Sequence, residues 1–390
     1  MSQWYTGRNA RELAMSVTKY KNREGWSHRD LLRLCHAKPG KDGVSVVLAY
    51  IAKGLEHAKQ AMQVSDATSE GSASAAMHLL EAAEEAGRST DERRVCDLIR
   101  THGLVREHVA TGLLNSVLVW DALLQKMPMT AMVRNLGKMS SIGLLVAGSP
   151  AEALVVERLT SEAALHRARV HPLSLLIAMK TYSAGRGDRG SLSWCVSHEV
   201  VGALDRAFYL AFKTIVPTGK SFLLALDVSG SMGISCAGQP KLSCREATAV
   251  LAMSVARVEK QYHCMAFSTK FMPLAITPEM SLDQVLQRTD RLPFGGTDCA
   301  VPMQWALRNN VDVDTFVVFT DSETWFGNEL PVQALRRYRS EINPNARLAV
   351  VAMASTGFSI ADPTDGGMLD IAGFDAALPA VLSDFSSGKV

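Results

Sequence analysis

Residues 221–231 read Ser-Phe-Leu-Leu-Ala-Leu-Asp-Val-Ser-Gly-Ser, and this stretch decides the fold of the C-terminal part of the chain. Its apolar run is too short for a core helix and ends in polar side chains, which favours a buried strand. A second run of the same kind, Thr-Phe-Val-Val-Phe-Thr-Asp-Ser, occupies residues 315–322. The two runs therefore predict two strands that are buried on both faces of a sheet.

Helical patterns alternate with these strands along the C-terminal part. Helices are predicted over 242–260, 282–290 and 331–341, and further strands over 262–267 and 346–353. Ser281 and Gln284 have the spacing of a capping box at the start of the second helix. Strands that alternate with helices are typical of a parallel, doubly wound α/β sheet.

The chain before about residue 215 has a different pattern, with one short amphipathic helix after another. Ser27 and Asp30 form a capping box that opens a helix at the run Leu-Leu-Arg-Leu-Cys-His. The other predicted helices lie near 7–22, 44–62, 75–86, 91–101, 105–110, 117–126, 129–138, 151–158, 161–167, 172–182 and 197–213. Such a succession favours an all-α array of HEAT-like repeats. We place the domain boundary at the Pro- and Gly-containing segment 216–220, which gives domains 1–216 and 217–390.

Composition and charge narrow the class of protein. The net charge of the 390 residues is only +2, but residues 1–220 carry 28 Lys and Arg against 21 Asp and Glu. This basic excess indicates a polyanionic partner, or else ordinary variation on solvated surfaces. The seven cysteines include no C-x-x-C pair, and no apolar run is long enough to span a membrane. We therefore expect the cysteines to be free thiols and the protein to be located in the cytoplasm, or in both the cytoplasm and the nucleus. We also expect a monomer.

A candidate metal site follows from the two buried strands. Asp227, Ser229 and Ser231 form the pattern D-x-S-x-S after the first strand, and Asp321 ends the second. The glycine loop 294–298 lies between them and presents Thr297. Because open α/β sheets place ligands at the carboxyl ends of their strands, these oxygens should converge. Hard oxygen ligands favour Mg²⁺, with Mn²⁺ as an alternative.

The same residues have two other interpretations. Asp227 and Asp321 could cap loops without binding a metal. A catalytic role would need further signals, and the chain has no G-x-S-x-G elbow, no Walker A pattern and no second carboxylate at position 229. We therefore expect a protein that is not an enzyme.

The metal-site pattern resembles the metal-ion-dependent adhesion site of von Willebrand A domains. Segments elsewhere in the chain, among them 17–40, 104–114, 127–140 and 170–182, closely resemble the TROVE module of the Ro (SS-A) ribonucleoprotein autoantigen family. The C-terminal segments 224–232, 292–306, 317–327 and 356–375 resemble the A domain of the same family. The resemblance covers nearly the whole chain and includes specific motifs.

This resemblance implies binding of small noncoding Y-type RNA on a basic outer face, and of misfolded RNA through a central hole, in ribonucleoprotein particles and RNA quality control. Carried over to this chain, it implicates Lys19, Arg23 and His36. Lys21, Arg29 and Arg33 add positive charge nearby. We expect Lys19 and Arg23, four residues apart, to share one helix face. His28 is a weaker candidate, and Trp26 is either a stacking residue or, as we prefer, a core residue.

The resemblance also implies that the helical module begins upstream of this chain, so that the module is expected to be incomplete at its N-terminus. The alternative function, from a different class, is a metal-dependent adhesion or scaffold module. In that case an acidic side chain of a protein partner would complete the metal coordination.

Overall fold

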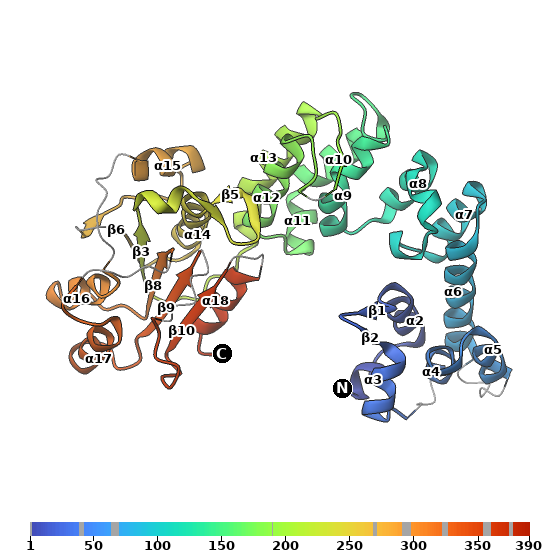
Figure 1. Ribbon diagram of the computed structural model, residues 1–390, viewed down its shortest axis with the longest axis horizontal. Coiled ribbons are helices and arrows are strands. Elements are labelled where there is room, and N and C mark those ends of the chain that lie inside the picture. The colour runs from blue at the N-terminus through green and yellow to red at the C-terminus, as the bar shows by residue number, and fades with distance from the viewer. Residues whose placement is uncertain are drawn as a thin grey trace. The chain divides into compact units, whose positions relative to one another are not determined.

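A computed structural model describes residues 2–38, 43–63, 70–188, 190–267, 271–290, 298–321, 327–353, 360–373 and 377–390. The chain divides into two compact units, Met1–Ala151 and Glu152–Val390. Figure 1 shows the element order along the chain. No helix in the described ranges combines the length and apolarity that crossing a membrane requires.

The first unit is built almost entirely of helices. Its elements are α1 (Ser2–Thr6), α2 (Ala10–Lys19), β1 (Asn22–Arg23), β2 (Trp26–Ser27), α3 (His28–Cys35), α4 (Val44–Lys53), α5 (Leu55–Gln63), α6 (Glu70–Arg88), α7 (Glu92–His102), η1 (Arg106–His108), η2 (Thr111–Asn115), α8 (Val117–Lys126) and α9 (Met129–Ser141). The long helix α6 packs against α2, α4, α5 and α7 and so forms the centre of this unit. Leu13, Leu79 and Leu80 are fully buried.

Two predictions for the first unit were wrong in detail. The helix predicted over 44–62 is two helices, because Gly54 adopts a φ of 88° that an α-helix cannot continue through. The helix predicted over 7–22 ends at Lys19, and the chain continues into a short antiparallel hairpin, β1–β2. Glu24 and Gly25 both have positive φ in its turn, the conformation of a type I′ connection. The predicted capping box of Ser27 and Asp30 then opens α3.

The second unit begins with helices and continues into the α/β sheet. Its elements are α10 (Pro150–Thr160), α11 (Glu162–Ala168), α12 (Pro172–Ser183), α13 (His198–Ala211), η3 (Phe212–Thr214), β3 (Phe222–Asp227), η4 (Gly230–Gly233), β4 (Ser235–Cys236), β5 (Gln239–Ser243), α14 (Cys244–Val258), β6 (Tyr262–Phe267), β7 (Phe271–Pro273), α15 (Leu282–Asp290), α16 (Val301–Arg308), β8 (Thr315–Thr320), α17 (Pro331–Glu341), β9 (Arg347–Ala352), β10 (Met368–Ala372) and α18 (Leu378–Ser386).

Helices before residue 216 pack directly on the sheet-containing part of this unit. The ammonium group of Lys180 on α12 lies 2.6 Å from a carboxylate oxygen of Glu246 on α14. Glu259 accepts hydrogen bonds from the backbone N–H groups of Thr218 and Gly219, and so fixes the connecting segment. The packing therefore divides the chain before the last helices of the all-α part, whereas the proposed domain boundary at 216 follows the change in sequence pattern.

The sheet has six strands in the order β10-β9-β8-β3-β6-β7. All neighbouring pairs are parallel except β6–β7, which is antiparallel. One face packs on α16 and α17, where Phe316 and Leu348 contact a cluster that includes Met303 and Leu335. In Figure 1, α16 and α17 lie together on one side of the sheet and α18 on the other. A helical all-α region followed by a mainly parallel α/β sheet confirms the predicted fold class.

Candidate metal centre and nucleic-acid interface

Four of the five predicted metal ligands, Asp227, Ser229, Ser231 and Asp321, lie at or directly after the ends of two neighbouring strands. Asp227 is the last residue of β3 and Thr320 the last of β8, and these two strands are adjacent and parallel. The chain leaves β3 toward β6 on one side of it and later returns to β8 on the other side. This reversal of direction is the topological switch point at which α/β sheets bind ligands. Asp321 follows β8 directly, so that both aspartates lie at this point.

Hydrogen bonds fix the orientation of the Asp227 carboxylate. Its Oδ1 accepts from the backbone N–H of Ser229 at 2.8 Å, and its Oδ2 accepts from the Thr320 hydroxyl at 3.1 Å. The hydroxyls of Ser229 and Ser231 lie 2.9 Å apart, which places two neutral oxygens beside the carboxylate. Thr320 was not singled out from the sequence, although its position directly before Asp321 at the strand end was a usable signal.

The two aspartates of this site are buried, so their negative charge needs a compensating cation. Asp227 and Asp321 are 2% and 6% exposed. Burial raises the pKa of Asp227, the Ser229 hydrogen bonds lower it, and the nearby Asp321 charge raises it again. Two buried carboxylates beside neutral hydroxyls are stabilised by a cation between them. Carboxylate and hydroxyl oxygens are hard ligands, so the donor set fits Mg²⁺ or Mn²⁺.

The remaining parts of the candidate metal centre differ in accessibility. Ser231 is exposed, whereas Ser229 is nearly buried. Thr297 lies outside the described residues. Its neighbour Asp298 accepts a hydrogen bond from the backbone N–H of Ala300 and packs against Gly327. A Cβ at Gly327 would come within 2.5 Å of the Asp298 carboxylate, so only glycine permits this approach.

The predicted basic residues gather around the β1–β2 hairpin, although not in the predicted way. Lys19 is the last residue of α2, whereas Arg23 lies on β1. The expectation that both share one helix face is therefore wrong, because the helix ends before the hairpin. Arg23 is fully outside the helix and is exposed.

The other predicted RNA-binding residues lie on the same part of the first unit. Lys21, Arg29, Arg33 and His36 are all exposed. His36 caps the end of α3 with a φ of 46°, a left-handed conformation that is uncommon for a residue with a side chain. Its exposure argues against a packing role in the core. We call the surface formed by Lys19, Lys21, Arg23, Arg29, Arg33 and His36 the basic face.

Exposed aromatic rings accompany these cations. Trp26 on β2 is 55% exposed and Tyr20 is 49% exposed, so the preferred core role for Trp26 was wrong. The ammonium group of Lys19 lies 5.0 Å from the centre of the Tyr20 ring. Trp26 pairs with Arg23 across the hairpin. Aromatic rings beside cations are the combination that proteins use to stack unpaired bases.

His28 has a different environment from the residues of the basic face. Its Nδ1 lies 2.9 Å from the Tyr5 hydroxyl, and its ring stacks on Trp4 at a centroid distance of 5.7 Å. Burial lowers its pKa. The histidine is therefore held in place by aromatic neighbours, and its first role is to position the start of α3.

Comparisons with known proteins identify the family of the chain. The family model described as TROVE domain matches residues 1–181, and the model described as Ro60 vWA domain matches residues 221–386. The RNA-binding protein RO60 of Caenorhabditis elegans is 39% identical over 423 residues, which span 100% of this chain and 65% of the relative. The RNA-binding protein RO60 of Deinococcus radiodurans is 39% identical over 381 residues, 97% of this chain and 69% of the relative.

A solved structure gives the same result for the fold. The crystal structure of the Deinococcus radiodurans RO (RSR) protein matches with a TM-score of 0.85 and 38% identity, and covers 100% of this chain and 76% of that chain. The chain thus spans about two thirds of the length of the Caenorhabditis relative. The names of these relatives describe RNA binding. The chain belongs to the Ro60 family, with a TROVE domain followed by a vWA domain.

Proposed function

We propose that this protein binds structured RNA through the basic face of its first unit. The observation that carries the proposal is the coincidence of exposed cations with exposed Trp26 and Tyr20 around one hairpin. Cations neutralise phosphates without regard to sequence, and the aromatic rings offer stacking surfaces to bases. The names of two relatives that match nearly the whole chain support the same activity.

The RNA partners are small noncoding RNAs of the Y type and misfolded RNAs, bound in ribonucleoprotein particles and RNA quality control. This finer assignment rests on the family resemblance of the quoted segments. We further propose that the protein works as a monomer in the cytoplasm or also in the nucleus.

The second unit contributes a divalent-cation site. Asp227 and Asp321 supply charge, and Ser229, Ser231 and Thr297 supply hydroxyls, for Mg²⁺ or Mn²⁺. When bound, the cation offsets the buried negative charge and offers an open coordination position. The basic face does not depend on this site, because its residues belong to the first compact unit.

The test is a gel-shift titration of the full chain with a small structured RNA, with and without EDTA. We expect the apparent dissociation constant to change by less than about twofold with EDTA, because phosphate contacts supply most of the affinity. Asp227→Ala should behave like EDTA-treated native protein. A failure of the native chain to shift any structured RNA would overturn the proposal.

A metal-dependent protein-binding module is the second candidate, and the exposure of Ser231 favours it. An exposed metal ligand allows the acidic side chain of a partner to complete the coordination. Under this alternative, EDTA and Asp227→Ala would abolish binding of the partner, while the basic face would be dispensable.

A further inference from the structure

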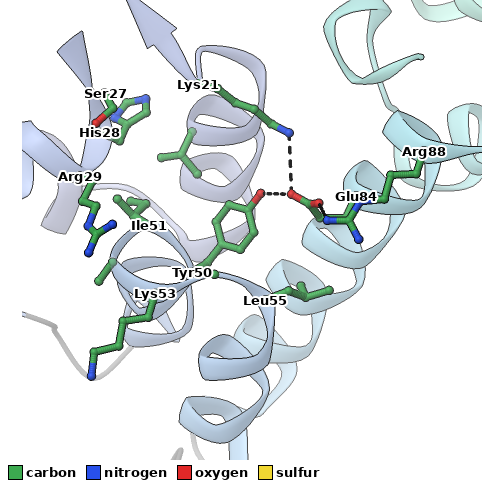
Figure 2. A pocket seen from close by; sticks show the side chains of 13 residues that line it. Lys21, Ser27, His28, Arg29, Tyr50, Ile51, Lys53, Leu55, Glu84 and Arg88 are labelled. Atoms are coloured by element: carbon green, nitrogen blue, oxygen red, sulfur yellow. Dashed lines mark hydrogen bonds and ion pairs between the residues drawn. The ribbon is translucent and has the colours of Figure 1, made fainter.

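Side-chain clusters away from the metal ligands differ in chemistry between the two units. In the first unit, the Glu84 carboxylate accepts a hydrogen bond from the Tyr50 hydroxyl at 2.6 Å and lies 3.7 Å from the Lys21 ammonium group, as Figure 2 shows. The groups of this cluster satisfy one another. In the second unit, Cys236 and Cys244 place two thiols together, and thiols can form new covalent bonds.

A short hairpin brings the two cysteines to one buried face. Ser235 on β4 and Ser243 on β5 are partners across this hairpin. Because successive side chains along a strand alternate between faces, the following residues, Cys236 and Cys244, turn to the opposite face. They are 3% and 0% exposed, and the Cys236 thiol donates a hydrogen bond to the Cys244 sulfur. The two sulfurs are therefore in contact.

The two thiols are not equivalent. Cys244 is the first residue of α14, whose capping box of Ser243 and Glu246 fixes the helix N-terminus. Free backbone N–H groups at this end of a helix favour a negatively charged sulfur. The hydrogen bond from Cys236 lowers the pKa of Cys244 and outweighs burial and the charge of Asp321, which both raise it. Cys244 is therefore the nucleophile of the pair, and Cys236 is its partner.

Cys264 on β6 shows the effect of burial alone. Burial raises the pKa of its thiol to about 12, so this cysteine stays protonated at neutral pH. A protonated, buried thiol is a poor nucleophile. The contrast with Cys244, which is just as buried, shows that the contact with Cys236 and the helix N-terminus determine the character of the pair.

The hairpin that covers the pair also controls access to it. β4 has only two residues, and the pairing of β4 with β5 shifts register between Ser235 and Cys236. Ile234, Ser235 and Gly238 are exposed, so this cover is thin. So short and irregular a hairpin opens locally at a low free-energy cost, which admits a small oxidant to the sulfurs.

We propose that Cys236 and Cys244 are a redox-active pair that hydrogen peroxide converts to a disulfide. In the first step, the Cys244 thiolate attacks one peroxide oxygen, the O–O bond breaks, hydroxide leaves, and Cys244 becomes a sulfenic acid. In the second step, the Cys236 sulfur attacks the Cys244 sulfur, the S–S bond forms, and the sulfenic oxygen leaves as water with the Cys236 proton. The two thiols lose two electrons, and the peroxide is reduced to two molecules of water.

The disulfide would hold the hairpin where it meets a helical segment of the second unit. The ammonium group of Lys241 on β5 lies 2.8 Å from an Asp188 carboxylate oxygen and donates to the Arg186 carbonyl at 2.9 Å. The disulfide closes the loop 236–244, which contains Lys241. Oxidation should therefore hold the hairpin against local opening and stabilise its contact with residues 186–188.

The test treats the full chain with hydrogen peroxide under conditions in which circular dichroism shows that it stays folded. Alkylation of free thiols followed by mass spectrometry should find a Cys236–Cys244 disulfide in most molecules, and dithiothreitol should reverse it. Cys264 should remain an alkylated thiol. If both Cys236 and Cys244 stay free in the treated chain, the proposal is wrong. The outcome does not depend on RNA binding, because the pair lies outside the basic face.

Variants identify the nucleophile. Cys236→Ser removes the partner, so dimedone should capture the Cys244 sulfenic acid about tenfold more than in the native chain. Cys244→Ser should give neither a disulfide nor capture at Cys236. The matched control, Cys195→Ser, removes an exposed thiol and should retain the disulfide. An unfolded variant would be captured at every cysteine, whereas the proposal confines capture to Cys244. Equal capture at Cys236 in Cys244→Ser would overturn the assigned roles.

Hydrogen exchange tests the effect on the hairpin. In the oxidised native chain, the backbone amides of residues 234–243 should exchange about fivefold more slowly than in the reduced chain, because the disulfide opposes local opening. Peroxide treatment of Cys244→Ser should leave the exchange of this segment unchanged. Equal exchange in the oxidised and reduced native chains would show that the disulfide does not hold the hairpin.

Discussion

The two candidate sites are built on opposite physical principles. In the second unit, Asp227 and Asp321 are almost fully buried at strand ends, and the surrounding backbone fixes their positions. In the first unit, the basic face consists of the half-buried Lys19 and of exposed side chains around a hairpin and a helix end. Buried carboxylates suit a small cation that loses its water shell on binding. Cations at the surface suit a large polyanion, because they can neutralise its phosphates without being buried.

This difference teaches where each site tolerates change. No neighbouring side chain can replace a buried carboxylate ligand, so a single mutation should abolish metal binding at that site. Several cations of the basic face each contribute to RNA binding, so the loss of one should weaken the affinity only in part. The following experiments can break or sharpen this contrast.

The largest effect is expected at the metal centre. Asp227→Ala should lower the affinity of the full chain for Mn²⁺ by at least about a hundredfold, because it removes a charged ligand from a low-dielectric site. Isothermal titration calorimetry measures this affinity directly. Asp283→Ala removes an exposed aspartate of α15 and should leave it unchanged. Unaltered Mn²⁺ binding by Asp227→Ala would show that the predicted ligands do not form the site.

This centre also shows how much of a site the sequence alone can predict. Asp227 and Asp321 could be placed together because each ends a buried strand, and the rules for parallel sheets bring such ends to one edge. The edge elements β7, β10 and α18 were not predicted, because short or partly exposed segments lack a strong apolar period. Their absence from the prediction did not affect the site.

The basic face shows the opposite case. Its residues could be named from the sequence, but their geometry could not, since helical periodicity was extended through Tyr20 into the hairpin. The turn at Glu24 and Gly25 was the missed signal.

The second prediction concerns buried polar groups that stabilise the fold rather than bind a ligand. Burial lowers the pKa of His108 to about 4, and its ring contacts the Thr18 hydroxyl at 3.0 Å. The unfolded chain, with an ordinary histidine pKa of about 6.5, binds more protons between pH 6.5 and 4. The free energy of unfolding should therefore be highest above pH 6.5 and fall by up to about 3 kcal/mol toward pH 4.

Urea denaturation of the native chain and His108→Gln at pH 7.0 and 5.0 tests this contribution. The variant should have a smaller loss of stability between the two pH values, although it is less stable at pH 7.0. His57→Gln, at an exposed position, should reproduce the native pH dependence. In the second unit, burial lowers the pKa of His171 to about 4 as well. His171→Asn should therefore reduce the pH dependence of the free energy of unfolding. Identical pH slopes in all four proteins would contradict the prediction.

A smaller effect is expected on the basic face. Lys19→Ala with Arg23→Ala should weaken binding of a structured RNA about tenfold at low salt and reduce the slope of log K against log salt by about two, one for each phosphate contact. Fluorescence anisotropy at several salt concentrations gives both quantities. His36→Ser should weaken binding with little change in slope if this side chain makes uncharged contacts.

The control for this experiment is Lys59→Ala with Arg100→Ala, which removes the same charge from other surfaces of the first unit. A reduction of the slope by the same amount would mean that net charge, rather than the basic face, determines RNA binding. In that case the contrast between a localised metal site and a localised RNA face would not hold.

The smallest effect is expected at the aromatic ring of the hairpin. Trp26 is more than half exposed on β2 and pairs with Arg23, so its removal leaves few packing contacts unsatisfied. Trp26→Ala should therefore change the melting temperature little but weaken RNA binding about three- to tenfold, as expected for one lost stacking surface. Trp26→Phe should restore most of the affinity, since a smaller ring still stacks. The salt slope should stay constant in both variants, because no phosphate contact is removed. A loss of stability comparable to the loss of affinity would assign Trp26 to the hairpin's own folding, and the basic face would then consist of cations alone.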